Sequence, residues 1–182
     1  MKNLTYINEL INEDLVDRLI NEVDWLDETK MRRECFMSDS KVEYTYLDYS
    51  GAPSYTSKDF HPSVKSILNE VNKKLGTNLD ICFLNLYMNS RNGLGWHSDD
   101  SHAIDHNEGI AVVSFGAERE IWWKLKGEKG TVPDENRRKL ENGSLFYMPP
   151  GFQSTHMHRI PKHDRECGPR VSLTFRKYKA GE

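Results

Sequence analysis

Apolar residues recur with a helical period in the first part of the chain. One stripe predicts an amphipathic helix over residues 12–26, with Asn12 as its N-cap and an apolar face of Leu15, Leu19, Ile20, Val23 and Leu26. A second stripe predicts a helix over residues 62–75, because Pro62 stands near its start and Gly76 follows its end. Between these helices, Tyr44-Thr45-Tyr46 indicates a short strand.

From residue 80 the pattern changes to short apolar runs that are separated by turn signals such as Asn142-Gly143 and Pro149-Pro150-Gly151. These runs predict strands over residues 80–88, 109–115, 120–125, 143–148, 155–160 and 170–177. Many short strands with turns between them are typical of a sandwich or barrel. We therefore expect a mixed α/β fold that is mainly β: a double-stranded β-helix, or jelly roll, with the N-terminal helices packed on one face.

The length of 182 residues fits a single domain over residues 1–182. Within it, we expect a helical N-terminal part over about 1–79 and a jelly-roll core over about 80–178. No apolar run approaches the roughly 18 residues of a membrane span, so no membrane partner is expected. The first residues lack the apolar segment of a signal peptide, and the three cysteines form no metal-binding pattern. We expect a monomer in the cytoplasm, or in the nucleus of a eukaryotic host.

Charge is distributed unevenly along the chain. Residues 1–120 hold 12 Lys and Arg against 21 Asp and Glu, whereas residues 121–182 hold 13 against 7. A basic last third is compatible with a polyanion that contacts one face of the protein. The alternative is that these charges are spread over a solvated surface.

His97-Ser98-Asp99 is a candidate metal-binding pair, because one intervening residue in an extended segment places both side chains on the same face. A histidine from a distant strand would complete a set of two histidines and one carboxylate, which is typical of non-haem iron(II). His156 and His158 both lie on a late strand and compete for that role. A loop histidine beside a solvated aspartate is the alternative, and zinc in a hydrolase accepts the same ligands.

The last predicted strand alternates two kinds of residue. Val171, Leu173 and Phe175 form an apolar face, and the opposite face carries Arg170, Ser172, Thr174 and Arg176. Arginines that face the inside of a small barrel need an anionic partner, and a dicarboxylate suits the guanidinium fork. On another strand, Asn85 and Tyr87 share a polar face that can hydrogen-bond the same dicarboxylate. The alternatives are an edge strand with its polar face in water and a Tyr87 packed in the core.

Several motifs occur in a fixed order over residues 30–178: Asn85-Leu86-Tyr87, His97-Ser98-Asp99-Asp100, Ser114-Phe115-Gly116-Ala117-Glu118-Arg119, Gly143-Ser144-Leu145, His158-Arg159-Ile160-Pro161, and Pro169-Arg170 through Arg176. In this order, the chain resembles the AlkB-like iron(II)/2-oxoglutarate-dependent dioxygenases, and most of all their nucleic-acid dealkylase branch. The resemblance implies an enzyme that uses Fe(II), 2-oxoglutarate and O2 to demethylate N-alkylated bases in DNA or RNA. Succinate, carbon dioxide and formaldehyde are the implied products.

The resemblance also implies roles for single residues. The implied iron ligands are His97, Asp99 and His158. Members of the family have their last ligand twelve residues before the first arginine of the final strand, and His158, not His156, stands at that distance from Arg170. Arg170 would bind the distal carboxylate of 2-oxoglutarate and Arg176 would lie near its iron-bound end, while Asn85, Tyr87 and Thr174 would assist. The implied substrate-recognition lid contains Tyr44 and Tyr46, which would border the base, and a basic residue at Arg32 or Arg33.

Basic side chains of the last third are candidates for contacts with phosphate groups. They are Lys124, Lys126, Lys129, Arg137, Arg138, Lys139, Arg159 and Lys162. In the pair Trp122-Trp123, one indole is expected in the core and the other outside, because neighbouring residues of a strand face opposite ways.

The chain departs from the family pattern at three positions. Ser101 stands where relatives often have a Glu that reads the base, Ser172 stands where Asn is usual, and Met157 replaces an aromatic residue. Two alternatives stay open, and the missing Glu favours the first of them. One is a hydroxylase of the same chemistry that acts on a protein or a modified nucleotide, and the other is a non-catalytic nucleic-acid-binding relative.

Overall fold

The computed structural model describes residues 3–27, 32–45 and 54–179. The first part contains β1 (Thr5–Ile7), α1 (Val16–Glu22), β2 (Arg32–Ser38), β3 (Glu43–Thr45), β4 (Ser54–Thr56) and α2 (Pro62–Leu75). The later part contains β5 (Ile81–Tyr87), β6 (Leu94–His97), β7 (Ile110–Gly116), β8 (Arg119–Leu125), the 3-10 turn η1 (Asp134–Asn136), β9 (Arg137–Leu140), β10 (Ser144–Met148), α3 (Phe152–Thr155), β11 (His156–Ile160) and β12 (Arg170–Arg176).

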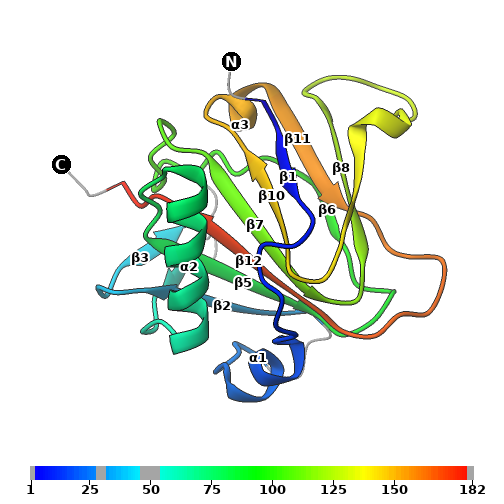
Figure 1. Cartoon of the computed structure of the whole chain (residues 1–182). Coiled ribbons are helices and arrows are strands. Elements are labelled where there is room, and N and C mark those ends of the chain that lie inside the picture. The colour runs from blue at the N-terminus through cyan, green and yellow to red at the C-terminus, as the bar shows by residue number, and fades with distance from the viewer. Residues whose placement is uncertain (1–2, 28–31, 46–53, 180–182) are drawn as a thin grey trace.

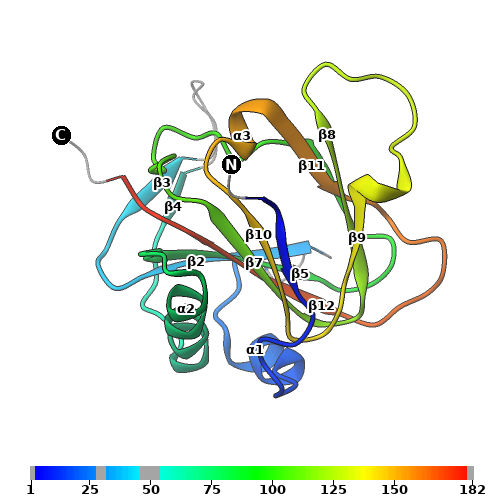
Figure 2. The same cartoon turned by 45° about the horizontal axis from the view of Figure 1, so that its top comes forward.

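Two antiparallel sheets face each other. One has six strands in the order β1-β10-β7-β12-β5-β2, and the other has four in the order β6-β11-β8-β9. Helices α1 and α2 lie against the side of the six-stranded sheet that is turned away from the four-stranded sheet (Figures 1 and 2). This arrangement confirms the predicted jelly roll with its helices on one face.

Alternation along the strands of the six-stranded sheet builds two separate interiors. Val171, Leu173 and Phe175 of β12 pack in the core beneath α1 and α2, together with Leu84 and Leu86 of β5. The neighbouring residues of both strands turn toward the four-stranded sheet, because successive side chains of a strand point to opposite faces. The polar face predicted for β12 is therefore enclosed between the two sheets, which excludes the solvent-exposed edge strand.

The predicted ends of one helix agree with the structure, and those of the other helix do not. Helix α2 has the predicted bounds: His61 caps its first turn, and Gly76 ends it in a left-handed conformation with a φ of 64°. Helix α1 is shorter than the predicted 12–26, and Asn12 as its N-cap is wrong. The Asp14 carboxylate instead accepts a hydrogen bond from the Val16 N–H at 3.2 Å.

The part of the chain before residue 80 contributes strands as well as helices to the fold. Strand β1 pairs with β10, and β2 pairs with β5 over its whole length. The expected boundary near residue 79 therefore does not separate a helical part from the sheets. The β2 pattern was missed because its polar residues, Arg32 and Glu34, face a cavity and interrupt the apolar period that marks a core strand.

The two tryptophans of β8 lie as predicted, one inside and one outside. Trp123 is buried and packs on Phe146 at 5.6 Å between ring centroids, whereas Trp122 is partly exposed.

Among the described residues, no helix combines the length and the apolar character that crossing a membrane requires.

Candidate functional site

A cavity of about 260 Å³ opens between the two sheets. Most of the residues singled out from the sequence line it: Arg32, Asn85, Tyr87, His97, Asp99, His158, Arg170, Thr174 and Arg176. These side chains come from β2, β5, β6, β11, β12 and the segment just after β6. The cavity thus collects polar groups from strands that are far apart in the sequence.

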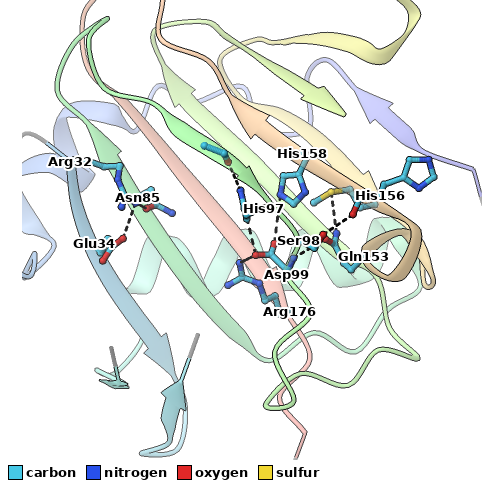
Figure 3. Close-up of polar contacts among 12 residues, drawn as sticks. Arg32, Glu34, Asn85, His97, Ser98, Asp99, Gln153, His156, His158 and Arg176 are labelled. Carbon is cyan, nitrogen blue, oxygen red and sulfur yellow. Dashed lines mark hydrogen bonds and ion pairs between the residues drawn. The ribbon is translucent and has the colours of Figure 1, made fainter. Parts of the chain in front are cut away.

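Three of the residues that line this cavity, His97, Asp99 and His158, form a cluster (Figure 3). The Nε2 atom of His97 lies 3.8 Å from Asp99 Oδ1, and that of His158 lies 3.8 Å from Asp99 Oδ2. The three potential ligand atoms lie within 4.8 Å of one another. Strands β6 and β11 create this arrangement, because they pair with His97 directly opposite His158.

Hydrogen bonds around the cluster orient its members. His97 Nδ1 lies 2.8 Å from the Gly95 carbonyl oxygen, a contact that places the proton on Nδ1 and leaves the Nε2 lone pair directed at the cluster. Asp99 follows β6, and its backbone N–H donates to Gln153 Oε1 of α3 at 2.9 Å. The Ser98 hydroxyl donates to the His156 carbonyl oxygen at 2.8 Å. These contacts attach the segment after β6 to α3 and to the start of β11.

The imidazole of His158 is buried, and burial together with the nearby His97 lowers its pKa to about 3. It is therefore neutral at physiological pH, which is the form that coordinates metals. Asp99 is also buried, and the Arg176 guanidinium lies 3.0 Å from its Oδ1. The cluster thus offers two imidazoles and one carboxylate that is paired with an arginine, a donor set that suits a divalent transition metal.

His156 does not belong to the cluster, although it lies two residues before His158. Its ring stacks on Phe152 at 4.6 Å and points away from His97 and Asp99 (Figure 3). Its Nδ1 lies 2.7 Å from the Thr155 hydroxyl. Strand alternation alone leaves the choice between the two histidines open, and the geometry agrees with the family resemblance in favouring His158.

Arg170 is a further charged group buried in the cavity wall. Its Nη2 donates to the Ser114 hydroxyl at 2.9 Å, and its guanidinium lies over the Tyr87 ring at 5.2 Å. Its Nε and Nη1 atoms have no hydrogen-bond partner within the described part of the chain. Burial lowers the pKa of this guanidinium, so the cavity holds a desolvated cation that would gain from an anion.

A polar network from β2 and β4 forms another part of the wall. The Arg32 guanidinium donates to Asn85 Oδ1 and to Glu34 Oε1, both at 2.8 Å (Figure 3). The Tyr55 hydroxyl donates to Glu34 Oε2 at 2.8 Å. The Tyr55 ring meets Phe83 edge-on at 5.0 Å. Because side chains alternate on β2, Arg32 and Glu34 line the cavity while Arg33 lies on the opposite face.

The aromatic residues expected beside the substrate are placed differently from the prediction. Tyr44 is 1% exposed and packs with Phe36 and Phe83 in a core cluster, so it does not line the cavity. Tyr55, opposite Tyr44 in the β3–β4 pair, lines it instead. Tyr46 lies outside the described residues. Sequence reasoning missed Tyr55 because a lone aromatic residue in Ser54-Tyr55-Thr56 carries no periodic signal.

Arg119, from the Ala117-Glu118-Arg119 motif, is a third buried arginine that sequence reasoning left without a role. Its Nη2 donates to the carbonyl oxygens of Asn92 and Pro161, at 2.7 and 2.5 Å. These contacts join the segment before β6 to the segment after β11. Arg119 therefore holds together the ends of the two strands that carry His97 and His158.

The three departures from the family pattern have different surroundings. The Ser101 hydroxyl donates to the Thr45 carbonyl oxygen at 2.8 Å, and Ser101 does not line the cavity. Ser172 does line it, opposite both Asn85 and Ser114. Met157 is partly exposed on β11 and pairs with Lys124 of β8.

Comparison with known proteins places this geometry in context. A family model described as the 2OG-Fe(II) oxygenase superfamily matches residues 5–176. Human alpha-ketoglutarate-dependent dioxygenase alkB homolog 3 is 30% identical over 171 residues, which cover 89% of this chain and 60% of the relative. DNA oxidative demethylase ALKBH2 of Arabidopsis thaliana is 32% identical over 166 residues, which cover 80% of this chain and 52% of the relative.

A solved structure described as that of OsALKBH1 superposes with a TM-score of 0.64 at 16% identity, covering 96% of this chain and 97% of the other. At that identity, the match shows a shared fold. The curated relatives are longer than the matched region, and this chain spans 60% or less of the two described above.

Proposed function

Because this chain belongs to the 2OG-Fe(II) oxygenase superfamily, we propose that it oxidatively dealkylates N-alkylated bases in DNA or RNA. The observation that carries the proposal is the joint placement of the His97–Asp99–His158 cluster and the buried Arg170 in one cavity. The names of two relatives, alkB homolog 3 and DNA oxidative demethylase ALKBH2, support the nucleic-acid substrate.

The cluster fits iron(II). Two imidazoles and a carboxylate on one side of a metal are the donor set of non-haem iron(II) oxygenases, and such a set leaves coordination positions open. His97 and His158 would bind through Nε2, and Asp99 through its carboxylate. When bound, iron(II) with 2-oxoglutarate and O2 supplies oxidising power for hydroxylation of an alkyl group, while 2-oxoglutarate is converted to succinate and carbon dioxide.

The remaining polar groups fit 2-oxoglutarate. Arg170 has two nitrogen atoms without a hydrogen-bond partner among the described residues, and a guanidinium fork binds a carboxylate through two parallel hydrogen bonds. Arg176, next to Asp99, would face the end of the co-substrate nearest the metal. Asn85, Tyr87 and Thr174 line the same wall and would supply hydrogen bonds to it. Together they would hold the co-substrate in one orientation.

The network of Arg32, Glu34 and Tyr55 would form the substrate side of the cavity. A base inside a duplex cannot reach a buried centre, so it must be flipped out or belong to a single strand. Tyr55 and Phe83 offer aromatic surface to such a base, and Glu34 offers carboxylate oxygens to its amino group. In this proposal Tyr55 and Phe83 border the base, the role that the sequence predicts for Tyr44.

A second candidate is a hydroxylase with the same chemistry that acts on a protein side chain or a modified nucleotide. It is favoured by Ser101, which stands where the family pattern has a base-reading Glu and which is engaged with Thr45 instead. In this case the iron and 2-oxoglutarate sites would be unchanged, and only the substrate would differ.

The test is the release of succinate and formaldehyde by the purified protein with iron(II), ascorbate and 2-oxoglutarate. Methylated DNA and RNA oligonucleotides, single-stranded and duplex, are compared with unmodified ones of the same sequence. We expect formaldehyde only with the methylated strands. Succinate without dependence on methylation would contradict the dealkylase and favour the second candidate, and no succinate under any condition would leave a non-catalytic binding relative.

Gln153 provides a separate prediction, because it orients Asp99 through the backbone rather than by binding the metal. Replacing Gln153 by leucine removes the acceptor of the Asp99 N–H and leaves this buried donor without a partner. We expect the iron(II) concentration for half-maximal activity to rise by about 10- to 100-fold, the usual effect of losing an outer partner of a metal ligand. Iron titration at saturating 2-oxoglutarate measures it.

The matched control is Gln153→Glu, which keeps an accepting oxygen, loses the Nε2 donor to the Met148 sulfur at 3.3 Å and adds a carboxyl group in its place. It should bind iron more tightly than Gln153→Leu. Equal iron dependence of both variants would mean that Gln153 only fills space beside the centre.

A further inference from the structure

Five side chains form a continuous stack across the outer face of the four-stranded sheet, in the order Lys124, Trp96, Arg159, Trp122 and Arg137. Lys124 and Arg159 lie over the Trp96 ring at 4.6 and 4.9 Å. Arg159 and Arg137 lie over the Trp122 ring at 4.5 and 4.3 Å. The stack draws residues from all four strands of the sheet: β6, β11, β8 and β9.

The stack lies on the side of the sheet opposite to the cavity. Trp96 and Arg159 each stand next to a cluster histidine, His97 and His158, and successive residues of a strand point to opposite faces. Trp122 likewise precedes the buried Trp123. The stack is therefore separate from the proposed metal and co-substrate sites, although it shares strands β6 and β11 with them.

Each of the two indoles contacts two cations, the one before it and the one after it in the stack. These contacts restrict the cationic side chains. Arg159, between the two indoles, makes no ion pair and no side-chain hydrogen bond within the described part of the chain, and its Nε is buried without a partner. Lys124 donates to a backbone carbonyl oxygen, that of Glu128, at 2.9 Å. Arg137 pairs with the exposed Asp134 at 3.2 Å.

This chemistry selects phosphate rather than bases as the ligand. The cation contacts use the ring faces on which a nucleic-acid base would stack. The outward edges of the guanidinium groups remain, and they match phosphate oxygens in geometry and charge. Because the indoles restrict the arginine side chains, less conformational entropy is lost when a phosphate binds.

A groove of about 800 Å³ runs beside the stack and adds to its charge. Its walls include Trp122 and Arg159 of the stack, together with Lys139, Lys162 and Arg165. Acidic groups are present as well: Glu118 pairs with Lys139, Glu120 accepts a hydrogen bond from the Trp122 indole, and Asp164 also lines the groove. The excess of cations agrees with the charge of +6 over residues 121–182.

We propose that this outer face binds the phosphate backbone of DNA or RNA outside the reacting nucleotide, with Arg159 as its central contact. The inference rests on the proposed function for its choice of polyanion, and it deepens that function by separating strand binding from base recognition. Contacts to phosphate carry no sequence information, so the face should bind modified and unmodified strands equally.

The test measures binding of an unmodified single-stranded 20-mer by fluorescence anisotropy at several salt concentrations. Arg159→Gln should weaken binding about three- to fivefold and reduce the slope of log K against log salt by about 0.7, the value for one phosphate contact on a single strand. Arg159→Lys keeps the charge and should retain the slope. Lys124→Gln provides a second variant, with the same expectation, at a position that leaves the Arg159–Trp122 contact in place.

Lys73→Gln is the matched control, since it removes one exposed cation from α2, on the far side of the six-stranded sheet. It should bind as the parent protein does. If Arg159→Gln and Lys124→Gln also bound with the parent affinity and slope, the proposal would be overturned. Displacement of the 20-mer by polyglutamate at equal charge concentration would equally contradict it, because it would indicate an acidic protein partner.

Binding and catalysis fail in distinguishable ways. Strand binding that depends on Arg159, without formaldehyde release from any methylated strand, would overturn the dealkylase and keep the surface. If formaldehyde is released but no stack variant changes the salt dependence of strand binding, the proposed surface is overturned and the dealkylase is kept.

Discussion

Replacing Asp99 by asparagine should reduce succinate formation by more than about 100-fold. Losing an outer partner of a metal ligand already costs about 10- to 100-fold in metal affinity, and the loss of a charged ligand must exceed that. Asparagine keeps the shape of the buried side chain and an oxygen that can accept a hydrogen bond from Arg176, which lies 3.0 Å from Asp99 Oδ1. The measurement is iron(II)- and 2-oxoglutarate-dependent succinate release, with circular dichroism as the check on folding.

Asp100 provides the matched control for this variant. It is the adjacent carboxylate, it is exposed, and it pairs with Lys126 at 3.1 Å rather than with the histidines. Asp100→Asn should therefore retain activity within about twofold, since an exposed ion pair contributes little. If Asp99→Asn turned over 2-oxoglutarate at the parent rate, the cluster would not be the metal centre.

Replacing Arg170 by glutamine should raise the KM for 2-oxoglutarate by at least about 30-fold. Removing one partner of a buried, hydrogen-bonded charge pair costs about 2–5 kcal/mol, and 2 kcal/mol corresponds to roughly 30-fold in affinity. The kcat at saturating co-substrate should change much less, because Arg170 lies in the cavity wall and is not a member of the cluster. Succinate release at varied 2-oxoglutarate measures both constants.

The stability of the Arg170 variant gives an independent readout. In the absence of 2-oxoglutarate, Arg170 is a desolvated cation whose Nε and Nη1 lack hydrogen-bond partners among the described residues, so its loss should leave the melting temperature unchanged or raise it. The increase in melting temperature that 2-oxoglutarate causes in the parent should be lost. Arg170→Lys keeps the charge without the fork and should be intermediate. A full ligand-induced increase in Arg170→Gln would contradict the assignment.

Much of the site follows from periodicity that is visible in the sequence. On β12 one residue in two is apolar, and the polar ones enter the cavity, whereas on β5 Leu84 and Leu86 pack in the core while Phe83, Asn85 and Tyr87 line the cavity. A strand has a period of two residues, so an alternating segment specifies which face each side chain occupies. For this reason the sequence predicts a shared site for five polar side chains: Arg170, Thr174, Arg176, Asn85 and Tyr87.

Other parts of the site depend on pairings that no local pattern encodes. His156 and His158 have the same alternation, and only the register of β11 against β6 places His158 opposite His97. Gln153 meets the Asp99 N–H across 54 residues, and Arg119 reaches carbonyl oxygens 27 and 42 residues away. Such contacts are set by how strands are ordered in a sheet, which depends on the packing of the whole chain.

The substrate side of the cavity also shows the difference between what local sequence patterns predict and what tertiary packing decides. The sequence indicated an aromatic and basic segment before residue 60, yet Tyr44 turned out to be a core residue, and Tyr55 and Glu34 occupy the cavity. The stack of Lys124, Trp96, Arg159, Trp122 and Arg137 likewise joins four strands that are not consecutive in the chain. The sequence by itself determined the fold class and the polar faces of β12 and β5, because these follow from local periodicity. Only the tertiary structure decided which of those residues meet, because strand order and register bring together side chains that are distant in sequence.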